Sequence, residues 1–268
     1  MKVGKKVLPD SYLAKLGNSS FVNKNIQSIR KKGFDHWRLL DHDIKMYVDP
    51  TDPHLLYMMD GKDPEQKVKE IFLENIYPGD VVIDVGSNIG DYTLLASKKV
   101  GDSGKVLSFE PLSETFLTLK RNLQLNKFTN CISFQKAVGE KPGLANLYKN
   151  NLSGTMGFLD SSLNGQNLIK RDEIEVVTID DVLTSKHIDV ANMIKIDVEG
   201  FEYEVLLGCL QSFKENKIKK ILCEVHYKYL ESKGKSEEII YDLLHEHNFT
   251  ITEISKRTPN RIHILATS

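Results

Sequence analysis

Hydrophobic and polar positions follow two different periods along most of this chain. Short, nearly continuous apolar runs such as Val81–Val85 precede longer segments in which apolar residues recur every three or four positions. The short runs are typical of strands buried on both faces of a parallel sheet, and the longer segments are typical of helices that cover such a sheet. The pattern therefore predicts an α/β protein assembled from right-handed strand–helix–strand units.

The predicted elements follow one another from residue 63 to residue 268. Asp63-Pro64-Glu65 offers a capping side chain, a proline at the first helical position and an acid in the first turn, which predicts a helix reaching about Ile76. We expect strands at Val81–Val85, Lys105–Glu110, Cys131–Ala137, Met193–Asp197 and Ile218–His226. We expect helices at Gly90–Lys99, Ser113–Asn126, Ile179–Leu183, Phe201–Phe213 and Ser236–His247. A last strand pair, Thr250–Ile254 and Arg261–Ala266, adds an antiparallel edge.

Two segments depart from this alternation. Residues 1–62 are polar, have only short patterns and carry scattered aromatic rings, which predicts a small helical and hairpin appendage with strand character in His36–Val48. The segment Gly143–Val177 is rich in Gly, Asn and Ser and predicts a β-rich insertion. We therefore predict an N-terminal appendage at 1–62 and one larger domain at 63–268, with the acceptor recognised by the appendage and the insertion.

Composition narrows the class of protein. The 36 Lys and Arg residues balance 37 Asp and Glu residues, so no overall positive field exists to attract nucleic acid or an anionic membrane. The three cysteines are scattered and form no CxxC pair, which favours a reducing compartment. No apolar run approaches the roughly 18 residues that a spanning helix needs. We expect a cytoplasmic protein without a nucleic-acid or membrane partner, and the oligomeric state stays open.

The segment Val81–Gly90, VVIDVGSNIG, carries the clearest chemical signal. A buried strand runs into a turn bracketed by Gly86 and Gly90, where glycine permits a close approach of backbone to a ligand. Asp84 lies near the carboxyl end of that strand, where open α/β sheets bind ligands. The spacing is G-x-x-x-G, with Asn88 in place of the middle glycine of a dinucleotide-binding turn, so a diphosphate fits poorly.

Glu110 suggests which ligand takes the place of a dinucleotide. It ends the next predicted strand, 110 − 90 = 20 residues after Gly90, where a carboxylate can accept both hydroxyls of a ribose. The chain has no G-x-x-x-x-G-K-[ST] phosphate loop. A ligand with a ribose, no phosphate and a cationic group near Asp84 fits S-adenosylmethionine (SAM), whose sulfonium and amino groups are positive.

Several motifs together resemble the FkbM-type family of SAM-dependent methyltransferases. They are DVGSNIGDYT (84–93), SFEP (108–111), FQKAVG (134–139), TIDDVL (178–183), IKIDVEGFEYEVLLG (194–208) and CEVH (223–226). The resemblance covers about Gly79 to His247, and the KIDVEG block is its most specific part. It implies SAM binding and methyl transfer, usually to an oxygen of a small molecule or sugar. The expected fold is the Rossmann-like class I methyltransferase sheet, seven mostly parallel strands with an antiparallel C-terminal edge.

The resemblance also assigns cofactor-binding candidates. Gly86, Asn88 and Gly90 would contact the methionine part of SAM. Glu110 would bind the ribose, and residues near Lys136 and Ala137 would flank the adenine. The neighbouring candidates are Asp84, Ser87, Pro111 and Asp197.

The catalytic candidates lie at the ends of the fourth and fifth predicted strands. Methyl transfer to a hydroxyl requires positioning of the acceptor and removal of its proton. Lys195, Asp197 and Glu199 alternate with aliphatic residues, so a strand places all three on one side. Glu224 and His226 share a side in the same way. We predict His226 as the general base, with a hydrogen-bonded histidine at the edge of the core as the alternative.

Each of the other candidates also has a structural interpretation. Lys195 pairs with Glu224 in the interpretation that we slightly prefer to a catalytic role. Asp197 can cap the following helix, and Glu199 favours the dipole of that helix. Oxygen atoms of Asp197, Glu199 and Glu224 could bind Mg²⁺, but no spacing demands a metal, and we predict none.

Two other functions remain open from the sequence. The segment RNLQLNK (121–127) is similar to segments of RNA-modifying enzymes, which suggests an RNA or nucleobase methyltransferase. The [DN]-P-P-[FYW] signature of exocyclic-amine methylation is absent, however, and KIDVEG stands in its place. The second alternative is a SAM- or nucleoside-binding module without catalysis, in which the appendage serves as a partner surface.

Overall fold

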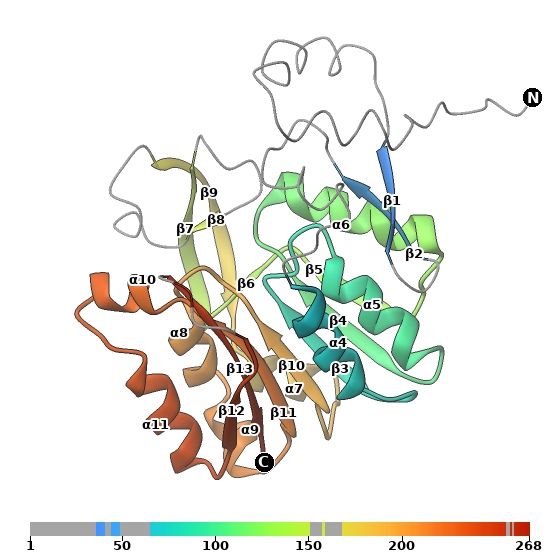
Figure 1. Cartoon of the computed structure of the whole chain (residues 1–268). Coiled ribbons are helices and arrows are strands. Elements are labelled where there is room, and N and C mark those ends of the chain that lie inside the picture. The colour runs from blue at the N-terminus through green and yellow to red at the C-terminus, as the bar shows by residue number, and fades with distance from the viewer. Residues whose placement is uncertain are drawn as a thin grey trace, which may run out of the picture.

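A seven-stranded sheet forms the centre of the fold (Figure 1). The computed structural model describes residues 65–150, 157–158, 168–255, 258 and 260–268, together with two strands at 36–40 and 44–48. The sheet consists of β3 (Val81–Val85), β4 (Lys105–Phe109), β5 (Cys131–Phe134), β10 (Met193–Ile196), β11 (Lys220–Val225), β12 (Thr250–Glu253) and β13 (Ile262–Thr267). Its order is β12-β13-β11-β10-β3-β4-β5, and only the pairings of β13 are antiparallel. The predicted class I methyltransferase sheet with an antiparallel C-terminal edge is confirmed.

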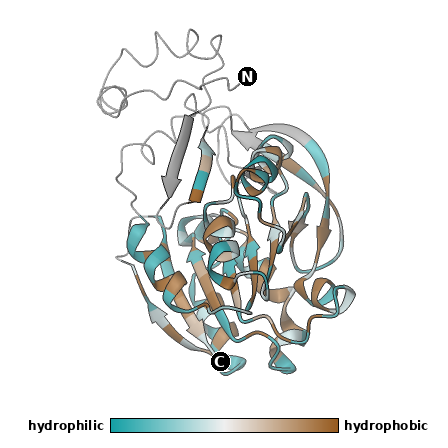
Figure 2. Cartoon of the chain, turned by 90° about the vertical axis from the view of Figure 1, so that its right-hand side faces the viewer, coloured by the Kyte–Doolittle hydropathy of each residue, from teal (hydrophilic) through white to brown (hydrophobic). Residues whose placement is uncertain are grey.

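Helices cover both faces of this sheet. They are α4 (Gln66–Glu74), α5 (Asp91–Val100), α6 (Ser113–Asn126), α7 (Ile179–Ser185), α8 (Glu202–Leu207), α9 (Leu210–Lys214), α10 (Tyr227–Ser232) and α11 (Glu238–Glu246). Helices α4 and α5 pack on one face of the sheet, around Val82, and α7, α8, α9 and α11 pack on the other, around Ile83. Successive residues of β3 thus serve opposite faces, as the pleat of a strand requires. Figure 2 shows hydrophobic residues along the strands between these layers.

Two predicted elements are divided in the structure, and one helix was not predicted. The predicted strand Cys131–Ala137 is divided, because β5 ends at Phe134 and Ala137 belongs to β6 (Ala137–Val138) of another sheet. The predicted helix Phe201–Phe213 is two helices, since the Asp180 carboxylate accepts the backbone N–H groups of Gln211 and Ser212 and so caps α9 from outside. Helix α10 follows β11 where we predicted no element.

The predicted β-rich insertion is a second, four-stranded sheet. It contains β6, β7 (Gly143–Asn150), β8 (Gly157–Phe158) and β9 (Leu168–Val177), in the order β6-β9-β7-β8. The pairing is parallel between β6 and β9 and antiparallel between β7 and both of its neighbours. The insertion therefore leaves the main sheet after β5 and returns beside its own starting point.

A strand pair from the predicted appendage docks on α6. Strands β1 (His36–Leu40) and β2 (Ile44–Val48) are antiparallel, as the strand character of His36–Val48 predicts. Asn122 of α6 accepts the backbone N–H of Tyr47 at 2.6 Å and donates to its carbonyl at 3.2 Å. Asn126 makes the same two bonds to Lys45. The rest of residues 1–62, including the predicted helical part, lies outside the described residues.

Two further observations concern the described part of the chain. The thiols of Cys131, Cys209 and Cys223 are all free. Among the described residues, no helix combines the length and the apolar character needed to cross a lipid bilayer.

Candidate functional site

The turn after β3 is held tightly against the end of β10. Gly86 has a φ of +80°, and a Cβ at this position would lie 1.8 Å from the carbonyl oxygen of Asp197. Any side chain at residue 86 would therefore collide with the backbone of residue 197. The N–H groups of Gly86 and Ser87 both donate to the carbonyl of Phe109 on the neighbouring strand. The turn that was expected to bind the cofactor is thus fixed between β4 and β10.

Glu110 connects this turn to the end of β4. Its carboxylate accepts the N–H of Asn88 at 3.0 Å and the N–H of Leu112 at 2.8 Å. Burial raises the pKa of Glu110 to about 7, and the two backbone donors partly oppose that rise. Each carboxylate oxygen has a second lone pair, so Glu110 can still accept bonds from a ligand.

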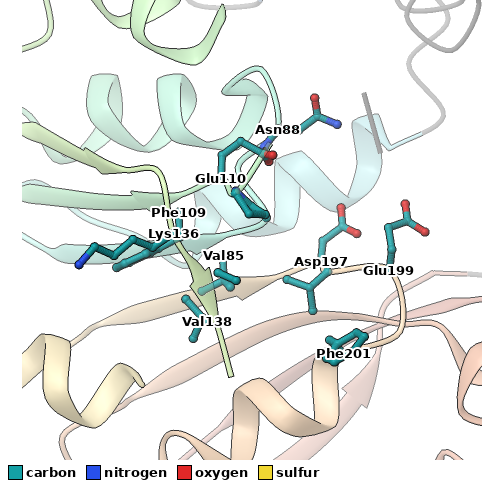
Figure 3. Close-up of a pocket in the computed structure, with 13 residues that line it drawn as sticks. Val85, Asn88, Phe109, Glu110, Lys136, Val138, Asp197, Glu199 and Phe201 are labelled. Carbon is teal, nitrogen blue, oxygen red and sulfur yellow. The ribbon is translucent and has the colours of Figure 1, made fainter. Parts of the chain in front are cut away.

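A cavity opens between the turn, the end of β4 and the segment after β10 (Figure 3). It is lined by eight of the predicted site residues, namely Gly86, Asn88, Glu110, Pro111, Lys136, Ala137, Asp197 and Glu199. The carboxylates of Asp197 and Glu199 point in the same direction in this view, on the opposite side of the cavity from Lys136. Lys136 forms an ion pair with Glu175 at 2.6 Å. One end of the cavity is therefore acidic.

Three predicted cofactor-binding residues are not part of the cavity lining. Asp84 is fully buried, and it accepts the hydroxyl of Thr93. The Ser87 hydroxyl donates to the carbonyl of Asp84 and accepts the N–H of Phe109. Gly90 directly precedes α5 as its N-cap residue and donates its N–H to the carbonyl of Ser87. In this structure these three residues make hydrogen bonds behind the cavity lining, and a contact of Asp84 with the cation of a ligand stays a prediction.

Lys195 joins Asp84 to Asp197. Its ammonium lies 3.1 Å from Oδ2 of Asp197 and 3.9 Å from Oδ1 of Asp84, above the ring of Tyr92. Burial alone would lower the pKa of Lys195, but the two aspartates outweigh it and raise the pKa above its usual value. Lys195 therefore remains charged, and it orients Asp197 instead of accepting a proton. The predicted interpretation that Lys195 pairs with Glu224 is wrong.

The backbone of the KIDVEG segment turns sharply after Asp197. Strand β10 ends at Ile196, so the strand alternation predicted for Lys195, Asp197 and Glu199 does not extend to Glu199. Glu199 has a φ of +53°, which is uncommon for a residue with a side chain, and Gly200 follows with +97°. A Cβ on Gly200 would lie 2.6 Å from Cβ of Tyr229. Strained backbone of this kind is often retained where it directs a functional side chain.

Three carboxylates surround the imidazole of His226. Its Nδ1 lies 2.9 Å from Oε1 of Glu202, and its Nε2 lies 3.4 Å from Glu199 and 3.6 Å from Glu224. Burial would lower the pKa of His226, but the carboxylates, Glu202 foremost, raise it to about 10. The ring is therefore an imidazolium at neutral pH and has no lone pair with which to act as a base.

Glu199 differs from His226 in its proton affinity and in its access to the cavity. Burial and the neighbouring acids raise the pKa of its carboxyl, His226 lowers it, and the result is about 7. Glu199 also lines the cavity, whereas His226 does not. Of the two residues, Glu199 has the position and the proton affinity of a general base.

Glu224 is held by residues from the C-terminal strand pair. Arg261 forms an ion pair with Oε1 of Glu224, and Nε2 of His263 lies 3.3 Å from Oε2. Burial would raise the pKa of Glu224, but the contact with His263 and the charges of His226 and Arg261 lower it to about 2. Sequence reasoning paired Glu224 with the wrong cation because Arg261 reaches it only through the antiparallel pairing of β11 with β13.

Within the described part of the chain, two groups of side chains meet the distance condition for binding a metal ion. They are Asp197, Glu199 and His226, and Glu65, Glu224 and His263, and the atoms within each group lie within 4.8 Å of one another. The first group contains two of the three residues predicted to be able to bind Mg²⁺. In both groups a protein cation, His226 or Arg261, already contacts the carboxylates.

Sequence reasoning did not identify several residues of the site. Phe109, Val138, Val198 and Phe201 supply apolar walls of the cavity. Glu202 was given no role from the sequence, although it is fully buried beside His226. Its position three and four residues before Val205 and Leu206 was the available signal, because that spacing places all three on the buried face of α8.

A comparison with family models identifies the family. Residues 84–251 match the family described as methyltransferase FkbM domain. Hexuronic acid methyltransferase AglP of Haloferax volcanii is 29% identical over 167 residues, which cover 60% of this chain and 62% of that protein. "Methyltransferase 1" of Beauveria bassiana is 30% identical over 162 residues, which cover 52% of this chain and 65% of that protein. The chain thus spans slightly less than two thirds of the length of these two relatives.

Two further matches cover a larger share of this chain. The 31-O-demethyl-FK506 methyltransferase FkbM of Streptomyces tacrolimicus is 27% identical over 217 residues, which cover 68% of this chain and 80% of that protein. The crystal structure of methyltransferase FkbM from Methylobacillus flagellatus KT aligns with a TM-score of 0.47 and 17% identity, covering 93% of this chain and 60% of that one.

Proposed function

Because this chain belongs to the FkbM family of methyltransferases, we propose that it transfers the methyl group of SAM to a hydroxyl oxygen of a small molecule or sugar. Two relatives support this choice of acceptor by their names, one acting on a hexuronic acid and the other on demethylated FK506. The observation that carries the proposal is a carboxyl group of intermediate proton affinity, Glu199, at the acidic end of the cavity.

The residues of the cavity fit SAM. Glu110 offers carboxylate oxygens for a ribose, and apolar side chains such as Phe109 and Val138 offer a surface for an adenine. Asp197 places a negative charge at the other end, where it would stabilise a sulfonium or an ammonium. Bound SAM would supply an activated methyl group and its own leaving group. The protein has to orient the acceptor and remove its proton.

The cluster around Glu199 performs the proton transfer in this proposal. Glu199 accepts the proton of the acceptor hydroxyl, for which a pKa near 7 is well matched. His226 stays protonated and donates toward Glu199 from 3.4 Å, which holds the carboxylate in place and keeps it partly ionised. Glu202 orients the imidazolium from its other side and itself accepts the N–H of Gly200. The base is therefore Glu199, and His226 is a positioning residue.

Calorimetry and a transfer assay test this function together. Isothermal titration with SAM should show binding at micromolar concentration, and formation of S-adenosylhomocysteine with hydroxylated acceptors should report methyl transfer. Failure to bind SAM overturns the proposal. Binding without transfer to any hydroxylated acceptor would instead favour the non-catalytic binding module.

A further inference from the structure

The hairpin of β1 and β2 packs against the helix that supports the cofactor turn. Figure 1 shows β2 alongside α6, and the two elements are in contact. Ile44 and Met46 of β2 are buried in the same apolar cluster as Ile89 of the turn and Leu119 of α6. A Cβ on Gly90 would lie 2.7 Å from Leu119, so the turn and α6 also approach closely. A segment far away along the chain thus shares its core with the turn that is expected to bind SAM.

Asn122 joins the hairpin to the turn through one side-chain amide. Its Oδ1 accepts the N–H of Tyr47 at 2.6 Å, and its Nδ2 donates to the carbonyl of Tyr47 at 3.2 Å and to the carbonyl of Ile89 at 2.8 Å. Nδ2 carries two hydrogens, so both donors of the amide are used. The side chain is fully buried, where an unpaired amide group would cost free energy. Docking of β2 therefore fixes the orientation in which the amide donates to Ile89.

The Ile89 carbonyl belongs to the backbone that shapes the cofactor cavity. The N–H of Ile89 donates to Oδ1 of Asn88 at 2.7 Å, and the N–H of Asn88 donates to Glu110 at 3.0 Å. Asn88 and Glu110 both border the cavity. Asn88 has a φ of +49°, a conformation that costs free energy in a residue with a side chain and persists only where surrounding contacts hold it. The bond from Asn122 to Ile89 is one of these contacts.

We propose that Asn122 is a positioning residue for the cofactor, and that its amide couples docking of the β1–β2 hairpin to the shape of the SAM-binding turn. This inference rests on the SAM binding proposed above. It also gives a role to the segment RNLQLNK (121–127), because two of its residues, Asn122 and Asn126, bind a strand of this same chain. Coupling between two sites is reciprocal, so bound cofactor should in turn stabilise the docked hairpin.

Asn126 provides a matched control one helical turn further along α6. Its Oδ1 accepts the N–H of Lys45 at 2.9 Å, and its Nδ2 donates to the carbonyls of Lys45 and Asn122. Both donors of Asn126 are therefore used away from the turn. Asn126→Ala removes bonds to the hairpin and leaves the turn untouched, whereas Asn122→Ala removes the bond to Ile89 as well.

Calorimetry with S-adenosylhomocysteine tests the role of Asn122. We expect Asn122→Ala to raise the dissociation constant about tenfold, and Asn126→Ala to raise it less than about threefold. Thermal melting shows whether each variant is folded at the temperature of the titration. Equal affinities of the two variants overturn the role of Asn122 alone. Failure of the unmodified protein to bind S-adenosylhomocysteine overturns the proposed function, and this inference with it.

Hydrogen exchange tests the coupling in the unmodified protein, so it does not depend on a variant that folds. Saturating S-adenosylhomocysteine should slow exchange of the Tyr47 amide at least about threefold more than exchange of the amides in β12. Strand β12 lies at the far edge of the main sheet and reports any general stabilisation. Slowing at Tyr47 that is no greater than in β12 overturns the coupling.

Discussion

Nε2 of His226 lies 3.4 Å from Oε2 of Glu199, with its other nitrogen against Glu202. The ring thus lies between a carboxylate that borders the cofactor cavity and one that is fully buried. A charged imidazole in this position neutralises part of an acidic cluster, and in the mechanism that we propose Glu199 accepts the proton. The first three predictions test this division of roles and its energetic consequences.

Replacing Glu199 by Gln should abolish most turnover while leaving cofactor affinity nearly intact. General bases contribute roughly 10²–10⁴ to rates, and we expect a loss of kcat in that range. The dissociation constant of S-adenosylhomocysteine, measured by calorimetry, should change little. Glu246→Gln, at an exposed position of α11, is the control. Turnover close to that of the control would remove Glu199 from the mechanism.

The pH dependence of kcat/KM should follow the ionisation of Glu199. Its raised pKa of about 7 means that the base form predominates above pH 7 and is lost below it. We therefore expect the rate to fall by roughly tenfold per pH unit on the acidic side. Binding of S-adenosylhomocysteine over the same range gives the separate contribution of Glu110, whose pKa is also about 7. A flat profile between pH 6 and pH 8, once binding is accounted for, contradicts the assignment.

His226 should contribute stability that disappears in alkaline solution. Its pKa is raised from 6.5 to about 10 in the folded protein, so its contribution is complete below pH 6.5 and is lost as the pH rises toward 10. His226→Gln should cost about 3 kcal/mol of unfolding free energy near neutral pH, because it leaves buried carboxylates without their cation. Urea denaturation at pH 7 and pH 10 measures both proteins. The difference between them should shrink at the higher pH, and a constant difference would count against the charged ring.

Gly86→Ala should destabilise the protein far more than Gly101→Ala. Both glycines have positive φ, but a Cβ at residue 86 meets the Asp197 carbonyl, whereas a Cβ at residue 101 meets nothing within 4 Å. The second variant thus measures the cost of the backbone conformation alone. We expect an additional loss of about 2 kcal/mol or more for Gly86→Ala in urea denaturation. Equal losses would show that the turn can move away from β10.

Glu110→Gln should weaken cofactor binding rather than catalysis. The two carboxylate oxygens of Glu110 accept the N–H groups of Asn88 and Leu112. The amide of glutamine has a single acceptor oxygen, which would have to serve these two N–H groups and a ribose hydroxyl. Hydrogen bonds to charged groups are worth about 1.5–3 kcal/mol, which corresponds to roughly a tenfold to hundredfold rise in the dissociation constant of S-adenosylhomocysteine. Calorimetry measures it, with the exposed Glu140→Gln as the control.

The sequence predicted the parts of this structure that depend on local patterns. A nearly continuous run of apolar residues predicts a buried strand at Val81–Val85. Strand β3 has the same bounds in the structure. Lys136 and Ala137 border the cavity, and their expected place beside an adenine stays a prediction. The division of the predicted helix after Phe201 depends instead on Asp180, which caps α9 from a distant part of the chain.

The ion pairs of the site could not be predicted from local sequence patterns, because they also depend on contacts between distant parts of the chain. Which residues meet Glu224 is decided by the register of β11 against β13, which places His263 opposite Glu224 and brings Arg261 within reach of it. The protonation of His226 depends on three carboxylates from two different segments. Residue spacing alone gives neither the register nor the burial that together fix these pKa values.

The insertion sheet has a consequence for how the family could diversify. Ala137 of β6 pairs with Val176 of β9, and Gly139 donates its N–H to the carbonyl of Val177. The chain thus departs and returns at adjoining positions, so segments of different length can be exchanged between these anchor points at a small cost in loop-closure entropy. The second sheet can therefore vary in length and sequence while the cavity beside it keeps its geometry.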